Sequence, residues 1–171
     1  MTGTSSSEKK VSLQEAEEQV VLTAKRLALL YHYTAEVLVE EFGMAKGEAL
    51  LKEIIGRYGS ESGTSARKKV EELGLPLTAE NFKAGSDLPR WGWKGDTVLC
   101  ADGEVRDRVT YCPLAEVWQE KGSGKLGRIY CQVDQAKYAA YNGTGCRHLK
   151  NVLDGDDCCL FDLCEKREPE G

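Results

Sequence analysis

Cysteines dominate the side chains of this 171-residue chain that could do chemistry, and all seven lie beyond residue 99. They are Cys100, Cys112, Cys131, Cys146, Cys158, Cys159 and Cys164. An odd number of cysteines, in a chain that starts without an apolar export segment, argues against a disulfide framework. We expect some of them to be small buried side chains. The others are candidates for nucleophilic or metal-binding chemistry.

Cys112 stands directly before Pro113, where a predicted strand ends and a predicted helix over residues 113–120 begins. At a helix N-terminus the free N–H groups and the helix dipole stabilise a thiolate and lower the pKa of the thiol. Such a thiol could act as a nucleophile or as a metal ligand. The alternative is a small side chain that only fills space beneath the loop.

A second group of reactive side chains follows on a predicted helix over residues 127–141. Cys131, Asp134, Tyr138 and Asn142 recur at three- or four-residue spacing and therefore share one stripe of that helix. A thiol, a carboxylate, a phenol and an amide on one partly buried face are costly unless something binds there. The stripe predicts a small-molecule site. The alternative is a set of hydrogen bonds that closes neighbouring loops.

The segment Gly155-Asp156-Asp157-Cys158-Cys159-Leu160-Phe161 leads into the last predicted strand. Strand alternation places Cys159 and Phe161 on the face expected to meet the core, where Cys112 and Cys131 could join them. Three cysteines, together with Asp134 or His148, could bind zinc or iron. No C-x-x-C pair supports this reading, so a metal site with Cys112, Cys131 and Cys159 as ligands stays an alternative.

The ordered set of motifs is Tyr111-Cys112-Pro113, Tyr130-Cys131-Gln132-Val133-Asp134, Asn142 and Gly155-Asp156-x-x-Cys159-x-Phe161. In this order they resemble the L-2-amino-thiazoline-4-carboxylic acid hydrolase family. Glu41-Phe42-Gly43 and Arg57-Tyr58-Gly59 fit as well, so the resemblance covers about residues 20–165. The last motif is also similar, more weakly, to vinyl-reductase-like ligand-binding domains.

The resemblance implies a small-molecule hydrolase that opens a cyclic C–N bond of a thiazoline-like substrate, gives an N-carbamoyl-cysteine type of product and requires no cofactor. With the patterns above, it implies two sets of site residues. The catalytic set is Cys112, Cys131, Asp134 and Cys159, and the substrate-binding set is Tyr138, Asn142, His148 and Asp156. Either a thiolate at Cys112 or Cys131 attacks the amidine-like carbon while Asp134 moves protons, or Asp134 activates water directly.

Two other functions stay open. One is a non-catalytic domain of the vinyl-reductase-like type that binds a small ligand or a metal or senses redox state. The other is a purely structural or partner-binding domain. Resemblance at the level of a fold does not by itself decide between them.

The secondary structure predicted to position these residues differs between the two halves of the chain. Apolar residues at three- or four-residue spacing predict a helix over residues 13–31, capped by Ser12, and further helices over 35–42, 47–58 and 64–73. Beyond residue 95, Asp102-Gly103 predicts a hairpin of strands 96–101 and 104–111. Two more strands are expected over 148–153 and 157–164. The expected fold is α+β, an N-terminal helical layer packed on a small C-terminal antiparallel sheet with two inserted helices.

We expect a disordered leader over residues 1–10, a single domain over 11–165 and a frayed tail over 166–171. The domain has a helical half (11–84) and a cysteine-rich mixed half (95–165). The net charge of −5 argues against binding to nucleic acid. No apolar run reaches the roughly 20 residues of a membrane helix, so a cytoplasmic location is expected. The expected partners are a small-molecule substrate and a second copy, bound through the N-terminal helices.

Overall fold

The computed structural model describes residues 10–86 and 89–164. The expected tail and the expected leader, apart from Lys10, lie outside these residues. The helices are α1 (Leu13–Phe42), α2 (Met44–Glu72), α3 (Phe82–Gly85), α4 (Pro113–Glu120), α5 (Gly124–Tyr130) and α6 (Val133–Tyr141), with 3-10 turns η1 (Arg90–Gly92) and η2 (Val152–Asp154). The strands are β1 (Lys94–Leu99), β2 (Val105–Tyr111), β3 (Gly145–Lys150) and β4 (Cys159–Cys164).

The N-terminal half forms two long helices instead of the four short ones predicted. Ser12 and Glu15 make the expected capping box at the start of α1, and Gly43 ends that helix as predicted. The predicted breaks inside α1 and α2 are wrong. Gly59 and Gly63 face α6, where an added Cβ would lie 2.7 Å from the Val133 carbonyl oxygen and 2.1 Å from the Lys137 carbonyl oxygen. These glycines therefore let two helices approach closely and do not end α2.

The four strands form one antiparallel sheet in the order β1-β2-β4-β3. The hairpin of β1 and β2 is confirmed, and Gly103 adopts the left-handed φ of 85° that its turn requires. The third strand was predicted three residues too late. It ends at Lys150 because Asn151 leaves the sheet and caps η2, accepting a hydrogen bond from the Leu153 amide.

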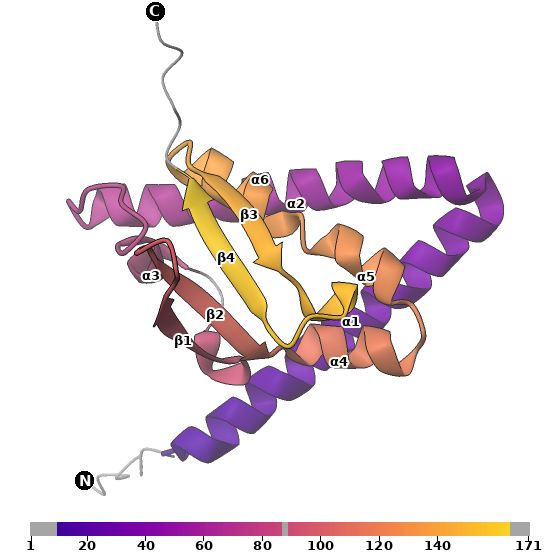
Figure 1. Ribbon diagram of the computed structural model, residues 1–171, viewed down its shortest axis with the longest axis horizontal. Helices are drawn as coiled ribbons and strands as arrows, with labels where there is room; N and C mark the ends of the chain where they lie inside the picture. Colours follow the sequence, from indigo (N-terminus) through magenta and orange to yellow (C-terminus); the bar gives the residue numbers. More distant parts are fainter. Residues whose placement is uncertain (1–9, 87–88, 165–171) are drawn as a thin grey trace, which may run out of the picture.

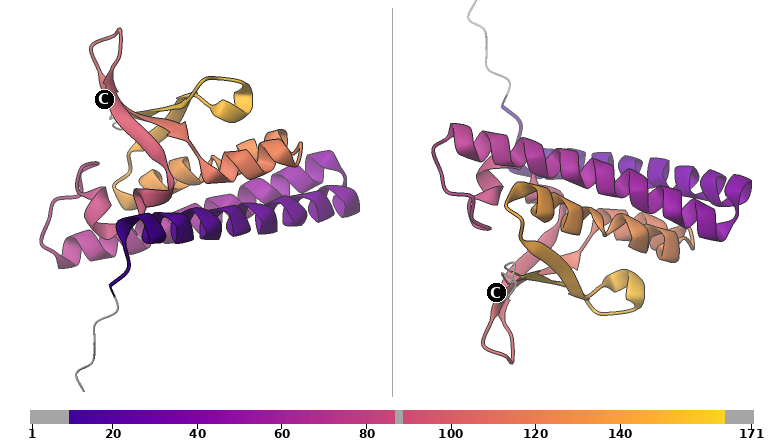
Figure 2. Two further views of the ribbon diagram at one scale, coloured as in Figure 1. Left: turned by 90° about the horizontal axis from the view of Figure 1, so that it is seen from below. Right: turned by 90° about the horizontal axis from the view of Figure 1, so that it is seen from above.

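The elements are stacked in three layers, with the sheet on the outside. Figure 1 shows α1 and α2 meeting in a V, and the side views in Figure 2 show α4, α5 and α6 between that pair and the sheet. Among the helices, α2 and α6 share the most extensive contact. The α+β fold class is confirmed, and the inserted helices are the layer that carries the sheet.

A buried aromatic core ties the two halves of the chain together. Trp118 of α4 is 1% exposed and donates its indole N–H to the Ala28 carbonyl oxygen of α1 at 3.0 Å. The Trp118 ring meets those of Tyr31 and Tyr130 at centroid distances of 5.4 and 5.3 Å. Because these rings come from α1, α4 and α5, burial of their apolar surface fixes α4 and α5 against the long helices.

The outer side of α1 keeps several large apolar side chains in contact with solvent, among them Leu30, Tyr33 and Val37. Association of two copies through the N-terminal helices stays a prediction. Among the described residues, no helix is both long and apolar enough to cross a membrane.

Candidate active site

The predicted helix over residues 127–141 is broken in the structure. Cys131 ends α5, Gln132 precedes α6, and Asp134 lies in the first turn of α6. Asp134 and Asn142 are eight residues apart, which corresponds to about 12 Å along a helix. The predicted stripe is therefore split into a Cys131–Asp134 end and a distant end.

Two predicted substrate-binding residues occupy that distant end. The Tyr138 ring packs on the Phe82 ring of α3 at 4.9 Å. Asn142 donates its side-chain N–H to the Leu77 carbonyl oxygen at 3.2 Å and accepts a hydrogen bond from the Thr144 amide at 3.0 Å. Asn142 thus closes the chain at the end of α6, which is the structural role left open by the sequence.

Five of the other six predicted residues gather where α4, α5, α6, β3 and β4 meet, and Asp156 does not join them. Asp134 is close enough to Cys112 and to Cys131 for its charge to act on both thiols, and Cys112 is similarly close to Cys159. We call this group the polar cluster, and it comprises Cys112, Cys131, Asp134, His148, Asn151 and Cys159. Five of its six members were predicted from the sequence.

Cys112 precedes α4 as predicted, with Pro113 in the first position of the helix. Burial raises the pKa of its thiol, and the nearby Ala115 and Leu114 amides and Trp93 side chain oppose that shift. The Cys112 side chain makes no capping hydrogen bond to the helix. The sequence predicted a lowered pKa. The helix N-terminus acts in the expected direction, but burial outweighs it.

Asp134 is held in its ionised form. Burial alone would raise the pKa of this carboxyl, but Lys137 and His148 outweigh burial and hold the pKa well below its usual value. The Lys137 ammonium lies 2.9 Å from Oδ1, and the His148 Nε2 lies 3.5 Å from Oδ2. The Asp134 side chain as a whole is 24% exposed.

Cys131 and Cys159 are poor nucleophiles in this environment. Burial raises the pKa of Cys131 to about 12 and that of Cys159 to about 11. The Cys131 thiol donates to the Gly127 carbonyl oxygen at a distance of 3.8 Å, and Cys159 is only 6% exposed. Since the thiolate is the reactive form, both thiols are protected at neutral pH.

Asn151 is the member of the polar cluster that the sequence reasoning missed. Asn151 is 1% exposed, its side chain bonds to the Nδ1 of His148, and it lies close enough to Cys131 to lower the pKa of that thiol. The predicted substrate-binding residue Asp156 is exposed and accepts the Asn151 backbone N–H at 2.7 Å, so it supports the loop that carries Asn151. An Asn one residue before a short apolar run is a capping signal that could have drawn attention to this position.

An apolar cavity of about 230 Å³ lies beside the polar cluster. Trp93, Leu114 and Tyr130 line it, together with residues of α1. Because Trp93 and Leu114 also lie close enough to the Cys112 thiol to act on its pKa, this cavity adjoins the cluster. A small ring could therefore rest against Trp93 and Tyr130 beside Cys112.

The alternative of a metal site finds no ready-made ligand set. Within residues 10–86 and 89–164, no three histidine, cysteine, aspartate or glutamate side chains are arranged to hold a metal ion.

The family model for L-2-amino-thiazoline-4-carboxylic acid hydrolase matches residues 23–163. The chain belongs to this family. The match spans every residue of the polar cluster. A search of curated proteins found no match, and a search of solved structures found none either.

Proposed function

We propose that this protein is a small-molecule hydrolase that opens a thiazoline-like ring carrying an amidine group. The family match supports the reaction class. The observation that carries the proposal is the placement of Cys112 at the start of α4, where the Leu114 and Ala115 backbone amides and the Trp93 side chain act to lower the pKa of its thiol. A thiol in these surroundings is prepared to become a thiolate once a base removes its proton.

The ring carbon between nitrogen and sulfur is the electrophile. The Cys112 thiol gives its proton to the basic ring nitrogen and its sulfur bonds to this carbon, after which the bond from the carbon to the ring sulfur breaks. The ring therefore opens at the C–S bond and not at the C–N bond expected from the sequence, because a carbamoyl product keeps the C–N bond. Water then displaces Cys112 from the carbon. Over the cycle one water is consumed: its oxygen becomes the carbamoyl oxygen, one hydrogen goes to the ring nitrogen and one to the ring sulfur.

Asp134 serves this reaction as a fixed negative charge. A carboxylate whose pKa lies well below its usual value is a weak base and stays ionised at neutral pH. It can accept hydrogen bonds from the amino group of the amidine and favour the positive charge that this group gains on protonation. Proton transfer through Asp134 itself, the other route considered from the sequence, fits its low pKa less well.

The test is hydrolysis of 2-amino-thiazoline-4-carboxylate, followed by chromatography of the carbamoyl product. We expect Cys112→Ser to lower kcat/KM by at least about 10³-fold. Cys100→Ser, in the hairpin loop outside the polar cluster, is the matched control and should keep full activity. Full activity in Cys112→Ser, with correct folding shown by circular dichroism, would contradict the assignment of Cys112 as the nucleophile.

A non-catalytic ligand-binding domain is the second candidate. The observation that favours it is the burial of the Cys131 and Cys159 thiols, which makes them unreactive. This candidate predicts that the wild-type protein binds the thiazoline, as measured by calorimetry, and releases it unchanged.

A further inference from the structure

The Asn151 side chain has a hydrogen-bond partner at each of its polar atoms. Its Oδ1 accepts the Leu153 backbone N–H at 2.9 Å. Its Nδ2 lies 2.8 Å from the Nδ1 of His148. The residue is 1% exposed, so solvent does not offer it alternative partners.

These contacts fix which way the amide points. If the amide were turned over, its NH₂ group would face the Leu153 N–H, and two donors would meet in a buried place. With Oδ1 on Leu153, Nδ2 must donate toward His148. The Nδ1 of His148 is then an acceptor and carries no proton, so in the neutral ring the proton is on Nε2.

The other ring nitrogen faces the polar cluster and is incompletely bonded. The His148 side chain is 7% exposed, and its Nε2 lies 3.5 Å from Oδ2 of Asp134. In the part of the chain that the structure describes, Nε2 has no aligned hydrogen-bond partner. The ring is held in place by Phe161, which it meets edge-on at a centroid distance of 4.5 Å. A buried N–H without an acceptor is costly, which points to a ligand atom as its partner.

We propose that Asn151 is a positioning residue that holds His148 as the Nε2–H tautomer, so that the imidazole donates a hydrogen bond in the site instead of acting as a base. The functional part of this proposal rests on the proposed hydrolase, because the Nε2–H group would donate to an oxygen or nitrogen of the substrate or to the attacking water. The tautomer itself does not depend on that function. His148 would stabilise negative charge that develops on this acceptor, next to the Asp134 carboxylate that binds the donor side of the amidine.

The decisive experiment is ¹⁵N NMR of the imidazole nitrogens in the full-length, uniformly labelled protein at neutral pH. The chain has only two histidines, His32 and His148. The signals are therefore assigned by loss of one set in His32→Gln or, independently, in His148→Gln. We expect a pyridine-type Nδ1 and a pyrrole-type, protonated Nε2 for His148. A protonated Nδ1 in the wild-type protein, or averaging of the two tautomers there, would by itself overturn the proposal.

Variants test whether Asn151 is the cause. Asn151→Asp replaces the donor with an acceptor and should move the proton to Nδ1, and Asn151→Ala should allow both tautomers. Asn81→Asp is the matched control, since the Asn81 side chain donates to the Pro76 carbonyl oxygen at 3.0 Å, in the segment before α3. An unchanged tautomer in both folded Asn151 variants would overturn the role of Asn151.

Kinetics then separate positioning from a general effect on the fold. We expect Asn151→Asp to lower kcat by roughly 10²-fold, the effect of losing one transition-state donor, with KM nearly unchanged. A loss confined to KM would contradict a donor that acts in the transition state. Absence of turnover in the wild-type protein would count against the hydrolase, while the NMR result would still decide the tautomer.

Discussion

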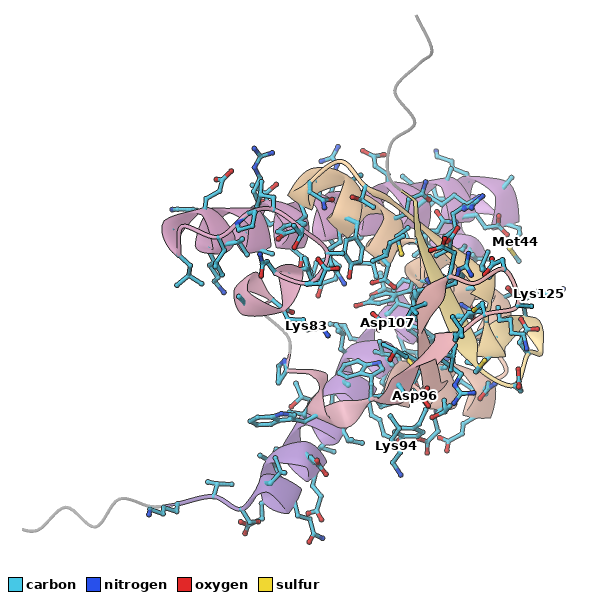
Figure 3. The ribbon with its side chains drawn as sticks, turned by 60° about the vertical axis from the view of Figure 1, so that its left-hand side comes forward. Met44, Lys83, Lys94, Asp96, Asp107 and Lys125 are labelled. Carbon is cyan, nitrogen blue, oxygen red and sulfur yellow. The ribbon has the colours of Figure 1, made fainter. Side chains whose placement is uncertain are left out.

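The two faces of the sheet carry similar residue types in opposite circumstances. On the outer face, Arg108 pairs across the strands with Asp96, labelled in Figure 3, at 2.6 Å, and Arg147 pairs with Asp162 at 2.6 Å. Arg108, Asp96 and Arg147 are between 38% and 66% exposed. On the inner face, His148 is 7% exposed and lies against Asp134 of α6.

The difference lies in what balances each charge. On the outer face the Arg108–Asp96 pair is exposed, so water and salt screen it and it contributes little. Asp162 is only 17% exposed, but two arginines, Arg106 and Arg147, pair with it and compensate its charge. On the inner face the ionised Asp134 depends on Lys137 and His148, and His148 still lacks an aligned partner at Nε2. Charges that are buried and incompletely bonded are expensive to keep, and they occur together where a ligand can complete them.

The largest effect on stability is expected at Asp134. Asp134→Asn removes the charge that Lys137 and His148 compensate and should lower the free energy of unfolding by about 3 kcal/mol. This is the low end for removing one partner of a buried ion pair, because the side chain as a whole is 24% exposed. Urea unfolding followed by circular dichroism measures the change. A loss no greater than at the outer pairs would break the distinction between the two faces.

The same variant has a defined pH dependence. The pKa of Asp134 is lowered by folding, so its contribution is complete above the unfolded value of about 3.8 and is lost as the pH falls toward the folded value. The stability difference between wild type and Asp134→Asn should therefore persist from neutral pH to about pH 4 and shrink in stronger acid. A difference that grows on acidification would have the wrong sign for this mechanism.

A smaller effect is expected on the outer face. Arg108→Gln breaks the pair with Asp96 and should change the free energy of unfolding by about 0.5 kcal/mol, an effect that salt further reduces. Repeating the urea titration at low and high salt tests this. A loss of several kcal/mol would mean that the outer pairs hold the hairpin in place.

The sequence predicted the local features of single elements better than the contacts between elements. Capping at Ser12 and the Asp102-Gly103 turn are local signals, and both held. Gly59 failed as a predicted helix end because its role, like that of Gly63, lies in contact with α6, more than 70 residues away in the chain. Spacing along one helix cannot show that another helix needs the room of a missing side chain.

For the candidate site, the sequence identified residue types but not their surroundings. Cys112 at the start of α4 was predictable from Pro113. Its raised pKa was not, since burial depends on how α4 packs. Asn151 was missed because its neighbours Cys131 and His148 reach it from different elements. Asn142 followed the helical spacing but closes a loop.

The most direct test of the central claim is chemical-shift mapping on the labelled full-length protein, with a non-hydrolysable 2-amino-thiazole as the probe. If the ligand binds in the polar cluster, the perturbed amides lie around Cys112, Asp134, His148 and Asn151. The account also predicts that Asp134→Asn weakens binding, while Arg108→Gln leaves it unchanged. Perturbations confined to the hairpin of β1 and β2, or equal binding by both variants, would contradict the placement of the functional site in the polar cluster.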